Sequence, residues 1–258
     1  MMDSRGSGDC ASGLRPGAAV LVIGNEILSG RTEDKNIPYI ARGLVANGIE
    51  LQEVRVTPDI EARIIEDINA LRKRYDYVFT TGGIGPTHDD ITTESVAKAL
   101  ELPIVERKDV IANMEEHYKK VGQVLNDERR KMATTPEGAE LILNPLSIAP
   151  GYRIENIFVM AGIPKIMQAM FDSTLLQLKG GKKIASITVH AACGEGDIAH
   201  ELSQIQHQYP GIDIGSYPVF NEGAGGPATN LVARGDDEVM LTEVQQQLEK
   251  LVAKYTAC

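Results

Sequence analysis

Two adjacent carboxylates, Asp89 and Asp90, lie just beyond a turn that is rich in glycine, residues 82–86 (Gly-Gly-Ile-Gly-Pro). An apolar run at 77–79 precedes the turn, and apolar residues at helical spacing follow the carboxylates. A strand, a glycine turn and a helix N-terminus together expose backbone N–H groups that attract phosphate. Carboxylates repel phosphate unless a divalent cation lies between them. The stretch therefore predicts a site for a metal ion and a phosphorylated ligand.

The glycine spacing at residues 82–86 differs from two known phosphate-binding motifs. The third glycine of the dinucleotide fingerprint is missing from its position, and the Gly-Lys-Ser/Thr of a P-loop does not follow. The competing interpretation is an ordinary strand-to-helix turn whose aspartates point into water. The aspartate pair favours a ligand site over that interpretation, because Thr81, Thr87 and Thr93 lie close to it in sequence.

Other polar residues stand where a predicted strand gives way to a loop or a helix. They are Asn25, Glu26, Asp34, Asn36 and Asp59. Each residue taken alone is typical of a helix cap or a turn. In a sheet of parallel strands, however, all these loops open on the same edge as the glycine turn. A second glycine turn, residues 162–164 (Gly-Ile-Pro), precedes a helix and offers the same kind of N–H groups.

The elements that must position these residues alternate between strands and helices. Strands are predicted at 18–23, 50–56 and 77–79, and the amphipathic pattern of 50–56 indicates a strand near the sheet edge. A helix capped by Asn36 follows the first strand, another helix follows the second, and a third begins with an N-cap at Thr92. This β-α-β-α-β-α order predicts a parallel sheet with helices on both faces.

The next part of the chain predicts one long element and several short ones. A charged helix is expected over 109–133, because apolar residues recur there at helical spacing. Short strands are expected at 141–143 and 157–160, with a loop over 144–152 between them. The helix that follows the second glycine turn carries apolar residues that would pack it back onto the sheet.

The only stretch with the composition of a linker is 179–183 (Lys-Gly-Gly-Lys-Lys). Beyond it the pattern changes to a β-α-β-β-α order of shorter elements. We therefore expect a disordered tail at 1–16, an α/β/α domain with a mostly parallel sheet at 17–178, and a smaller α+β domain at 182–258.

The composition of the 258 residues limits the classes of partner. A formal net charge of −10 argues against nucleic acid and anionic membrane surfaces, which both favour a basic face. No apolar run is long enough to span a bilayer. The three cysteines lack metal-ligand or CxxC spacing, which is typical of a reducing compartment. We therefore expect a cytoplasmic protein that binds neither nucleic acid nor membrane.

Two long stretches, residues 24–36 and 80–92, resemble the N-terminal region of the CinA (competence/damage-inducible protein A) family. Segments 149–152, 160–164 and 215–218 are similar to the same family. That region is a molybdopterin-binding domain of the MoaB/MogA type, and a similar domain begins eukaryotic FAD synthase. The resemblance implies a three-layer α/β/α fold that binds a nucleotide or pterin phosphate.

The resemblance also implies an activity, the metal-dependent hydrolysis of a phosphoric anhydride in ADP-ribose or a related dinucleotide such as FAD. Asp90 and Asp59 match the family's acidic positions and are the expected catalytic residues. We assign Asp89, Asp90 and Asp34 as ligands of a divalent cation, Mg²⁺ or Co²⁺. The expected substrate-binding residues are Asn25, Glu26, Asn36, Thr81, Gly82, Gly83, Gly85, Thr87, Thr93, Gly162 and Pro164.

Two alternatives to hydrolysis stay open on the sequence. One is a non-catalytic module that binds molybdopterin or a nucleotide, and the other is adenylyl transfer to molybdopterin. Full-length CinA proteins carry a further amidohydrolase domain, and the sequence to Cys258 does not include it, so we expect neither deamidase nor FAD-forming activity. Residues 146–148 (Leu-Ser-Ile) stand where the family has Val-Gly-Thr. MoaB-type domains are oligomeric, so the resemblance implies a homodimer or homotrimer.

Overall fold

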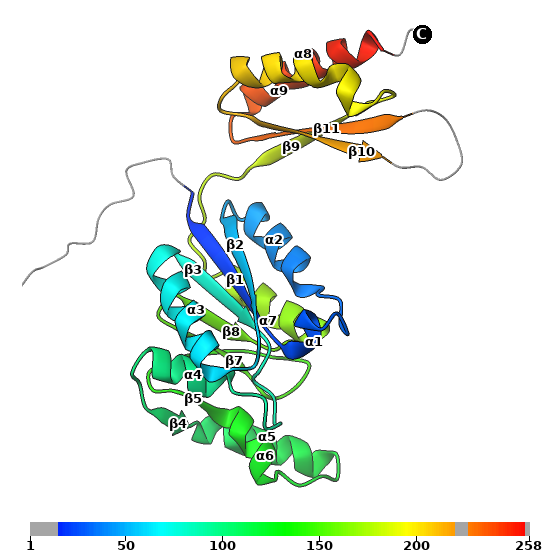
Figure 1. The fold of residues 1–258 in the computed structure, drawn as a ribbon. Coiled ribbons are helices and arrows are strands. Elements are labelled where there is room, and N and C mark those ends of the chain that lie inside the picture. Colours follow the sequence, from blue (N-terminus) through cyan, green and yellow to red (C-terminus); the bar gives the residue numbers. More distant parts are fainter. Residues whose placement is uncertain (1–14, 220–226, 256–258) are drawn as a thin grey trace, which may run out of the picture. The chain divides into compact units, whose positions relative to one another are not determined.

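The computed structural model describes residues 15–219 and 227–255, so the tail predicted for 1–16 lies almost entirely outside the described residues. The chain divides into two compact units, Met1–Gly181 and Lys182–Cys258. The first unit contains elements β1 to α7 and the second contains β9 to α9 (Figure 1). None of the helices in the described ranges has the length and apolar character needed to cross a membrane.

A six-stranded sheet forms the middle layer of the first unit, in the order β2-β1-β3-β8-β7-β6 (Figure 1). Its strands are β1 (Gly17–Ile23), β2 (Glu50–Thr57), β3 (Tyr77–Thr81), β6 (Glu140–Ile142), β7 (Gly151–Ile154) and β8 (Ile157–Met160). Strands β2, β1, β3 and β8 run parallel, whereas β7 and β6 pair antiparallel. The prediction of a mostly parallel sheet is confirmed, and β2 lies at its edge as its amphipathic pattern indicates.

Helices cover both faces of this sheet, which confirms the predicted three-layer α/β/α architecture. Helices α2 (Asn36–Ala46) and α7 (Pro164–Leu175) pack on one face. Helices α3 (Glu61–Arg74) and α4 (Thr92–Ala99) pack on the other. Successive side chains of a strand point to opposite faces, so each buried strand contributes to both layers of core.

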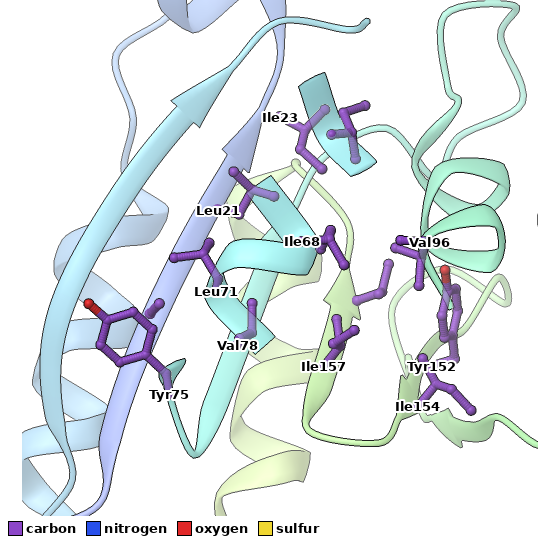
Figure 2. Packing of buried hydrophobic residues seen from close by; sticks show 14 of the residues in the cluster. Leu21, Ile23, Ile68, Leu71, Tyr75, Val78, Val96, Tyr152, Ile154 and Ile157 are labelled. Atoms are coloured by element: carbon purple, nitrogen blue, oxygen red, sulfur yellow. The ribbon is translucent and has the colours of Figure 1, made fainter. Parts of the chain in front are cut away.

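The hydrophobic core fixes both helical layers to the sheet. Figure 2 shows the cluster beneath α3 and α4, where Ile68 and Val96 pack in the same core as Leu21 of β1. On the opposite face Phe79 and Phe158 stack with their ring centroids 5.0 Å apart. Each such buried side chain contributes about 1.5–3 kcal/mol of transfer free energy. The two layers therefore hold the ends of the central strands firmly in place.

A network of charged and polar side chains covers part of the edge strand β2. Glu53 accepts hydrogen bonds from Tyr75 Oη and Arg55 Nε, both at 2.6 Å, and Arg55 also contacts Asp67 at 2.7 Å. The hydrogen bond from Tyr75, followed by that from Arg55, lowers the pKa of Glu53 below its usual value. Charged residues on an edge strand also discourage pairing with another chain.

The prediction of one helix over 109–133 is wrong, because the segment is broken. Helix α5 (Lys108–Lys120) ends just before Gly122, which has a φ of +69°. Helix α6 (Asp127–Arg130) and the 3₁₀ helix η1 (Lys131–Ala133) follow the break. A left-handed glycine directly after a helix satisfies its last carbonyl groups and stops it.

Three short strands were not expected from the sequence. β4 (Ile104–Glu106) and β5 (Thr134–Pro136) pair antiparallel as a separate two-stranded sheet. The predicted loop over 144–152 is also too long, because its last two residues begin strand β7. Strands of three or four residues are too short for an alternating pattern to stand out in the sequence.

The predicted N-caps of α2 and α4 are each displaced by one residue. Asn36 and Thr92 are the first helical residues, and Lys35 and Ile91 hold the N-cap positions without a side-chain hydrogen bond. In α2 the capping hydrogen bond comes from outside the helix, because Asp34 Oδ1 accepts from the Ile37 N–H at 2.7 Å. The side chains of Asn36 and Thr92 are thereby left for other contacts.

The second unit is a small α+β domain, and its β-α-β-β-α order confirms the prediction. Its elements are β9 (Ala185–Ala191), α8 (Glu195–Gln208), β10 (Asp213–Val219), β11 (Ala228–Gly235) and α9 (Glu238–Ala253). The strands form an antiparallel sheet in the order β10-β11-β9. Leu231 of β11 packs with Ile198 of α8 and Leu248 of α9, so both helices share one core with the sheet.

Candidate functional site

Three turns at the carboxyl ends of parallel strands enclose a cavity of about 500 Å³ in the first unit. The turn after β1 leads into the short helix α1 (Asn25–Leu28) and contributes Glu26. The turn after β3 contributes residues 82–86, and the turn after β8 contributes residues 161–164. This is the edge at which open α/β sheets bind their ligands.

Glycine is required in the β3 turn because the backbone segments lie very close together. Gly82 has a φ of +103°, and a Cβ built on it would overlap the carbonyl oxygen of Ile23 at the end of β1. A Cβ on Gly162 would lie 3.2 Å from Gly82 Cα. The three turns are therefore packed backbone against backbone around one cavity.

Thr92 ties the start of α4 to the glycine turn. Its hydroxyl donates to the Gly82 carbonyl oxygen at 2.9 Å, and its N–H donates to the Gly83 carbonyl oxygen at 2.9 Å. The side chain is fully buried. Thr92, which was predicted as an N-cap, therefore stabilises the conformation of the glycine turn through two hydrogen bonds.

The aspartate pair is separated by the structure into two environments. Asp90 lines the main cavity, and its Oδ2 accepts from Thr87 N–H at 2.8 Å and Thr87 Oγ1 at 2.5 Å. Asp89 is exposed and contacts Thr87 Oγ1 at 2.6 Å through Oδ1. The Thr87 hydroxyl is the largest cause that holds the pKa of Asp89 below its usual value. Thr87 orders both carboxylates, but only Asp90 faces the cavity.

A smaller cavity of about 50 Å³ adjoins the main one. Its walls include Asp34, Asn36 and Thr81, together with Glu26, which lines both cavities. Asn36 Nδ2 donates to the Gly162 carbonyl oxygen at 2.9 Å, a contact between residues 126 positions apart in the chain. This hydrogen bond joins the start of α2 to the turn after β8.

Asn25, Asp59 and Thr93, also predicted as site residues, lie outside these two cavities. Asp59 accepts the Asn25 N–H at 2.9 Å, so it holds the turn after β1 in place. Neither Asp59 nor Asn25 lines the main cavity or the smaller cavity. Thr93 lines a third and much smaller cavity of about 10 Å³, which Asp90 also lines. Gly82, Gly83, Gly85, Gly162 and Pro164 line the main cavity.

Two contributions to the site were missed by the sequence reasoning. Lys131 of η1 donates to the Asp90 carbonyl oxygen at 2.6 Å and forms an ion pair with Glu94 at 3.2 Å. Ser147 lines the main cavity, and its loop is held by Asn144 Oδ1, which accepts from the Ser147 N–H at 3.1 Å. The sequence contains no signal for Lys131, whereas Ser147 belongs to the stretch that departs from the family pattern.

The acidic residues can be tested against the coordination that a divalent cation needs. Among residues 15–219 and 227–255 no group of three or more His, Cys, Asp and Glu side chains is arranged to hold a metal ion. Glu26 and Asp90 both line the main cavity. Mg²⁺ is commonly bound by one or two carboxylates together with water and substrate phosphates. Two carboxylates are therefore present on the wall of the main cavity, and the described residues add no third one to form a site made by protein side chains alone.

Each of the two units is similar to a known protein family. Residues 19–179 match the family described as "Probable molybdopterin binding domain". Residues 183–257 match the family described as "FAD synthase, middle domain". The boundary between the two matches falls beside the boundary between the two compact units at Gly181 and Lys182.

Three proteins with similar sequence or structure come from archaea. A protein of Archaeoglobus fulgidus is 33% identical over 77% of this chain and 84% of its own length. A protein of Pyrobaculum arsenaticum is 31% identical over 93% of this chain and 94% of its own length. The crystal structure of the protein CinA with unknown function from Thermoplasma acidophilum superimposes with a TM-score of 0.58. It shares 32% identity and covers 63% of this chain and 97% of that chain.

The molybdopterin binding domain match covers more than half of the chain. The CinA structure covers a similar share of the chain, 63%. The expected resemblance is thereby confirmed for the first unit. The chain belongs to the molybdopterin binding domain family and is a CinA-like member of it.

Proposed function

We propose that the first unit binds a small phosphorylated pterin or nucleotide in the main cavity. The observation that carries this proposal is the convergence of two glycine turns, residues 82–86 and 161–164, on one cavity of about 500 Å³. Pockets for small molecules have volumes of roughly 300–1,000 Å³. Backbone N–H groups in such turns attract anions, so the cavity can bind a phosphate although the whole chain carries a net charge of −10.

The N-terminus of α7 supports the placement of a phosphate group at this cavity. Ile163, Pro164 and Ile166 all line it. The N-cap residue of α7 is Ile163, whose side chain cannot form a hydrogen bond. The N–H groups in the first turn of α7 therefore have no side-chain cap. A helix start with free N–H groups attracts anions, and the helix dipole adds to this attraction.

Apolar side chains support the placement of a ring beside the phosphate. Met132, Ile166 and Met170 line the same cavity as the glycine turns. Methionine and isoleucine offer flexible apolar contacts to a flat heterocycle. A ligand with a ring and a phosphate, as in a pterin phosphate or a nucleotide, matches both parts of the wall.

The binding proposal is tested by two nearly isosteric variants at the start of α7. Ile163→Asp and Ile163→Asn both supply a good N-cap, so both should keep or raise the stability of α7. Only the aspartate adds a negative charge where a phosphate would bind. We expect Ile163→Asp to bind ADP or a pterin phosphate about tenfold or more weakly than Ile163→Asn in isothermal titration calorimetry. Equal affinities would remove the phosphate from this end of the cavity.

Hydrolysis of a phosphoric anhydride, as in ADP-ribose or FAD, is the second candidate function. It is favoured by the presence of Glu26 and Asp90 on the wall of the same cavity. A bound Mg²⁺ or Co²⁺ would neutralise phosphate charge and lower the pKa of a bound water. The chain's own part would be to orient the anhydride through the glycine turns and to keep the Asp90 carboxylate in place through Thr87.

A direct assay separates binding from hydrolysis. ADP-ribose and FAD are incubated with the purified protein, with each metal or a chelator, beside the variant Asp90→Asn. Release of AMP that needs metal and falls about 100-fold or more in the variant supports hydrolysis. Saturable binding without turnover supports the binding function alone. Transfer of an adenylyl group to molybdopterin, tested in parallel, would identify the third alternative.

We also propose that the chain assembles as a homodimer or homotrimer in the cytoplasm. This proposal is based on the oligomeric habit of MoaB-type domains, which the resemblance implies. Light scattering coupled to size-exclusion chromatography measures the mass directly against the 28.0 kDa of one chain. A mass of one chain at micromolar concentration would contradict it.

A further inference from the structure

The smaller cavity beside the main one differs from it in size and in the polar groups on its wall, and phosphate binding in the main cavity does not explain these features. It has a volume of about 50 Å³ and shares Glu26, Thr32, Gly162 and Pro164 with the main cavity. A water molecule takes up roughly 10–15 Å³ of such a cavity. The smaller cavity therefore has room for about three to five water-sized groups, which is too little for a fused ring system.

Two buried polar atoms among the residues that line this cavity have no hydrogen-bond partner. Thr81 is 1% exposed and its Oγ1 is unpartnered. Asn36 is 4% exposed, and its Oδ1 is unpartnered while its Nδ2 donates to the Gly162 carbonyl oxygen. Because Gly162 O can only accept, the amide orientation is fixed and Oδ1 is left as an acceptor. Buried polar atoms are almost always paired, so these two atoms are the candidate partners for a group that enters the cavity.

The charges around the smaller cavity indicate which groups it accepts. Its walls carry three carboxylates, Glu26, Glu33 and Asp34, against one ammonium group, Lys35. This excess of negative charge disfavours a second phosphate. Carboxylates and an amide oxygen accept hydrogen bonds, whereas the Thr81 hydroxyl can donate or accept. The cavity therefore suits small groups that donate hydrogen bonds and can also accept one.

We propose that the smaller cavity binds a pair of neighbouring hydroxyl groups on the ligand whose phosphate lies in the main cavity. The inference rests on the proposed binding function, and it narrows the ligand to a phosphate ester with a polyhydroxylated end, as in a sugar phosphate or ribonucleotide. Thr81 Oγ1 and Asn36 Oδ1 are the expected partners of the two hydroxyls. A ring, if present, stays in the larger cavity with Met132 and Met170.

The test uses one ligand with the hydroxyl pair and one without it. Binding of ADP and of 2′,3′-dideoxy-ADP to the full chain is measured by isothermal titration calorimetry. We expect ADP to bind about tenfold more tightly, since a hydrogen bond to a buried polar group is worth about a factor of ten. In Thr81→Val this preference should shrink by about the same factor, and the melting temperature should stay equal or rise because an unpaired hydroxyl has been removed.

Thr80→Val is the matched control for the variant at Thr81. Thr80 is 0% exposed and its Oγ1 is also unpartnered, but it shares the opposite face of β3 with Val78 and lines neither cavity. This control should change the melting temperature in the same direction and leave the preference for ADP intact.

The outcomes separate the two proposals from each other. If the wild-type protein binds neither nucleotide, the binding function fails. If it binds both nucleotides equally, or if Thr81→Val weakens both by the same factor, the binding function stands and the hydroxyl subsite is overturned. If Thr80→Val also lost the preference for ADP over 2′,3′-dideoxy-ADP, the loss in Thr81→Val would be due to altered packing of β3, and the hydroxyl subsite would be overturned.

Discussion

Replacement of Gly82 by alanine tests whether the backbone packing of the three turns determines the site. Gly82 has a φ of +103°, and its added Cβ would overlap the Ile23 carbonyl oxygen. The left-handed backbone costs about 1–2 kcal/mol for a residue with a side chain. The overlap with β1 adds roughly 1–3 kcal/mol, as overpacking does elsewhere in protein interiors. The expected loss in the free energy of unfolding is therefore about 2–5 kcal/mol.

Gly138→Ala is the control that isolates the contact from the backbone strain. Gly138 has a φ of +83°, and a Cβ built on it meets nothing within 4 Å. It should lose only about 1–2 kcal/mol. For a unit of this size 1 kcal/mol corresponds to about 2–4 °C in melting temperature. Differential scanning calorimetry should then show a fall of about 4–20 °C for Gly82→Ala and about 2–8 °C for Gly138→Ala in the transition of the first unit.

The same two variants connect stability to binding. Gly82→Ala moves β1 and β3 apart at the cavity, so it should also weaken the binding of ADP, whereas Gly138→Ala should not. The reasoning would be refuted if both variants lost the same stability, because the close approach of Gly82 to Ile23 would then have no energetic weight. Unchanged binding in Gly82→Ala would refute its connection to the site.

Three further predictions follow from single contacts. Lys131→Met should lower the stability of the first unit by about 1–2 kcal/mol, because the partly buried Glu94 loses its cation. The pKa of Glu53 is lowered in the folded state, so the Glu53 carboxylate stabilises the fold at pH values above its usual pKa of 4.5. This stabilisation is lost as the pH falls through the lowered pKa. Glu53→Gln should therefore flatten the decline in melting temperature between pH 5 and 3. Burial raises the pKa of the Cys193 thiol, so iodoacetamide at pH 8 should modify it at least about 100-fold more slowly than in urea.

Each of these predictions has a result that would contradict it. A Lys131→Met variant with wild-type stability would show that Glu94 does not need its partner. An identical acid profile in wild type and Glu53→Gln would remove Glu53 from acid unfolding. Rapid modification of Cys193 in the folded protein, mapped by mass spectrometry, would show that its burial does not protect it.

The parts of the fold that the sequence predicts are those with strong and long patterns. The apolar runs of β1 and β3 and the alternating pattern of β2 are each visible without a structure, and together they predict the parallel sheet. The meeting of residues 82–86 with residues 162–164 is predictable too, because parallel strands end at the same edge.

The rest depends on contacts between distant segments. Asp34 and Asp59 both lie shortly before a helix, yet Asp59 accepts the Asn25 N–H while Asp34 lines a cavity. Sequence spacing cannot separate these two outcomes, because both are ordinary turn positions. Lys131 reaches Asp90 from the segment in which the predicted helix over 109–133 is broken, so only the folded chain shows the contact.

The hydrogen bond between Asn36 and Gly162 has a consequence for the timing of biosynthesis. Its two residues are 126 positions apart, and β8 must insert beside β3 before they can meet. A chain that grows from its N-terminus at about 5–20 residues per second makes β1, β2 and β3 several seconds before β8. A ribosome-bound or truncated chain that ends before Gly162 therefore has neither cavity complete. Binding of the proposed ligand would then have to wait until nearly the whole first unit has been synthesised.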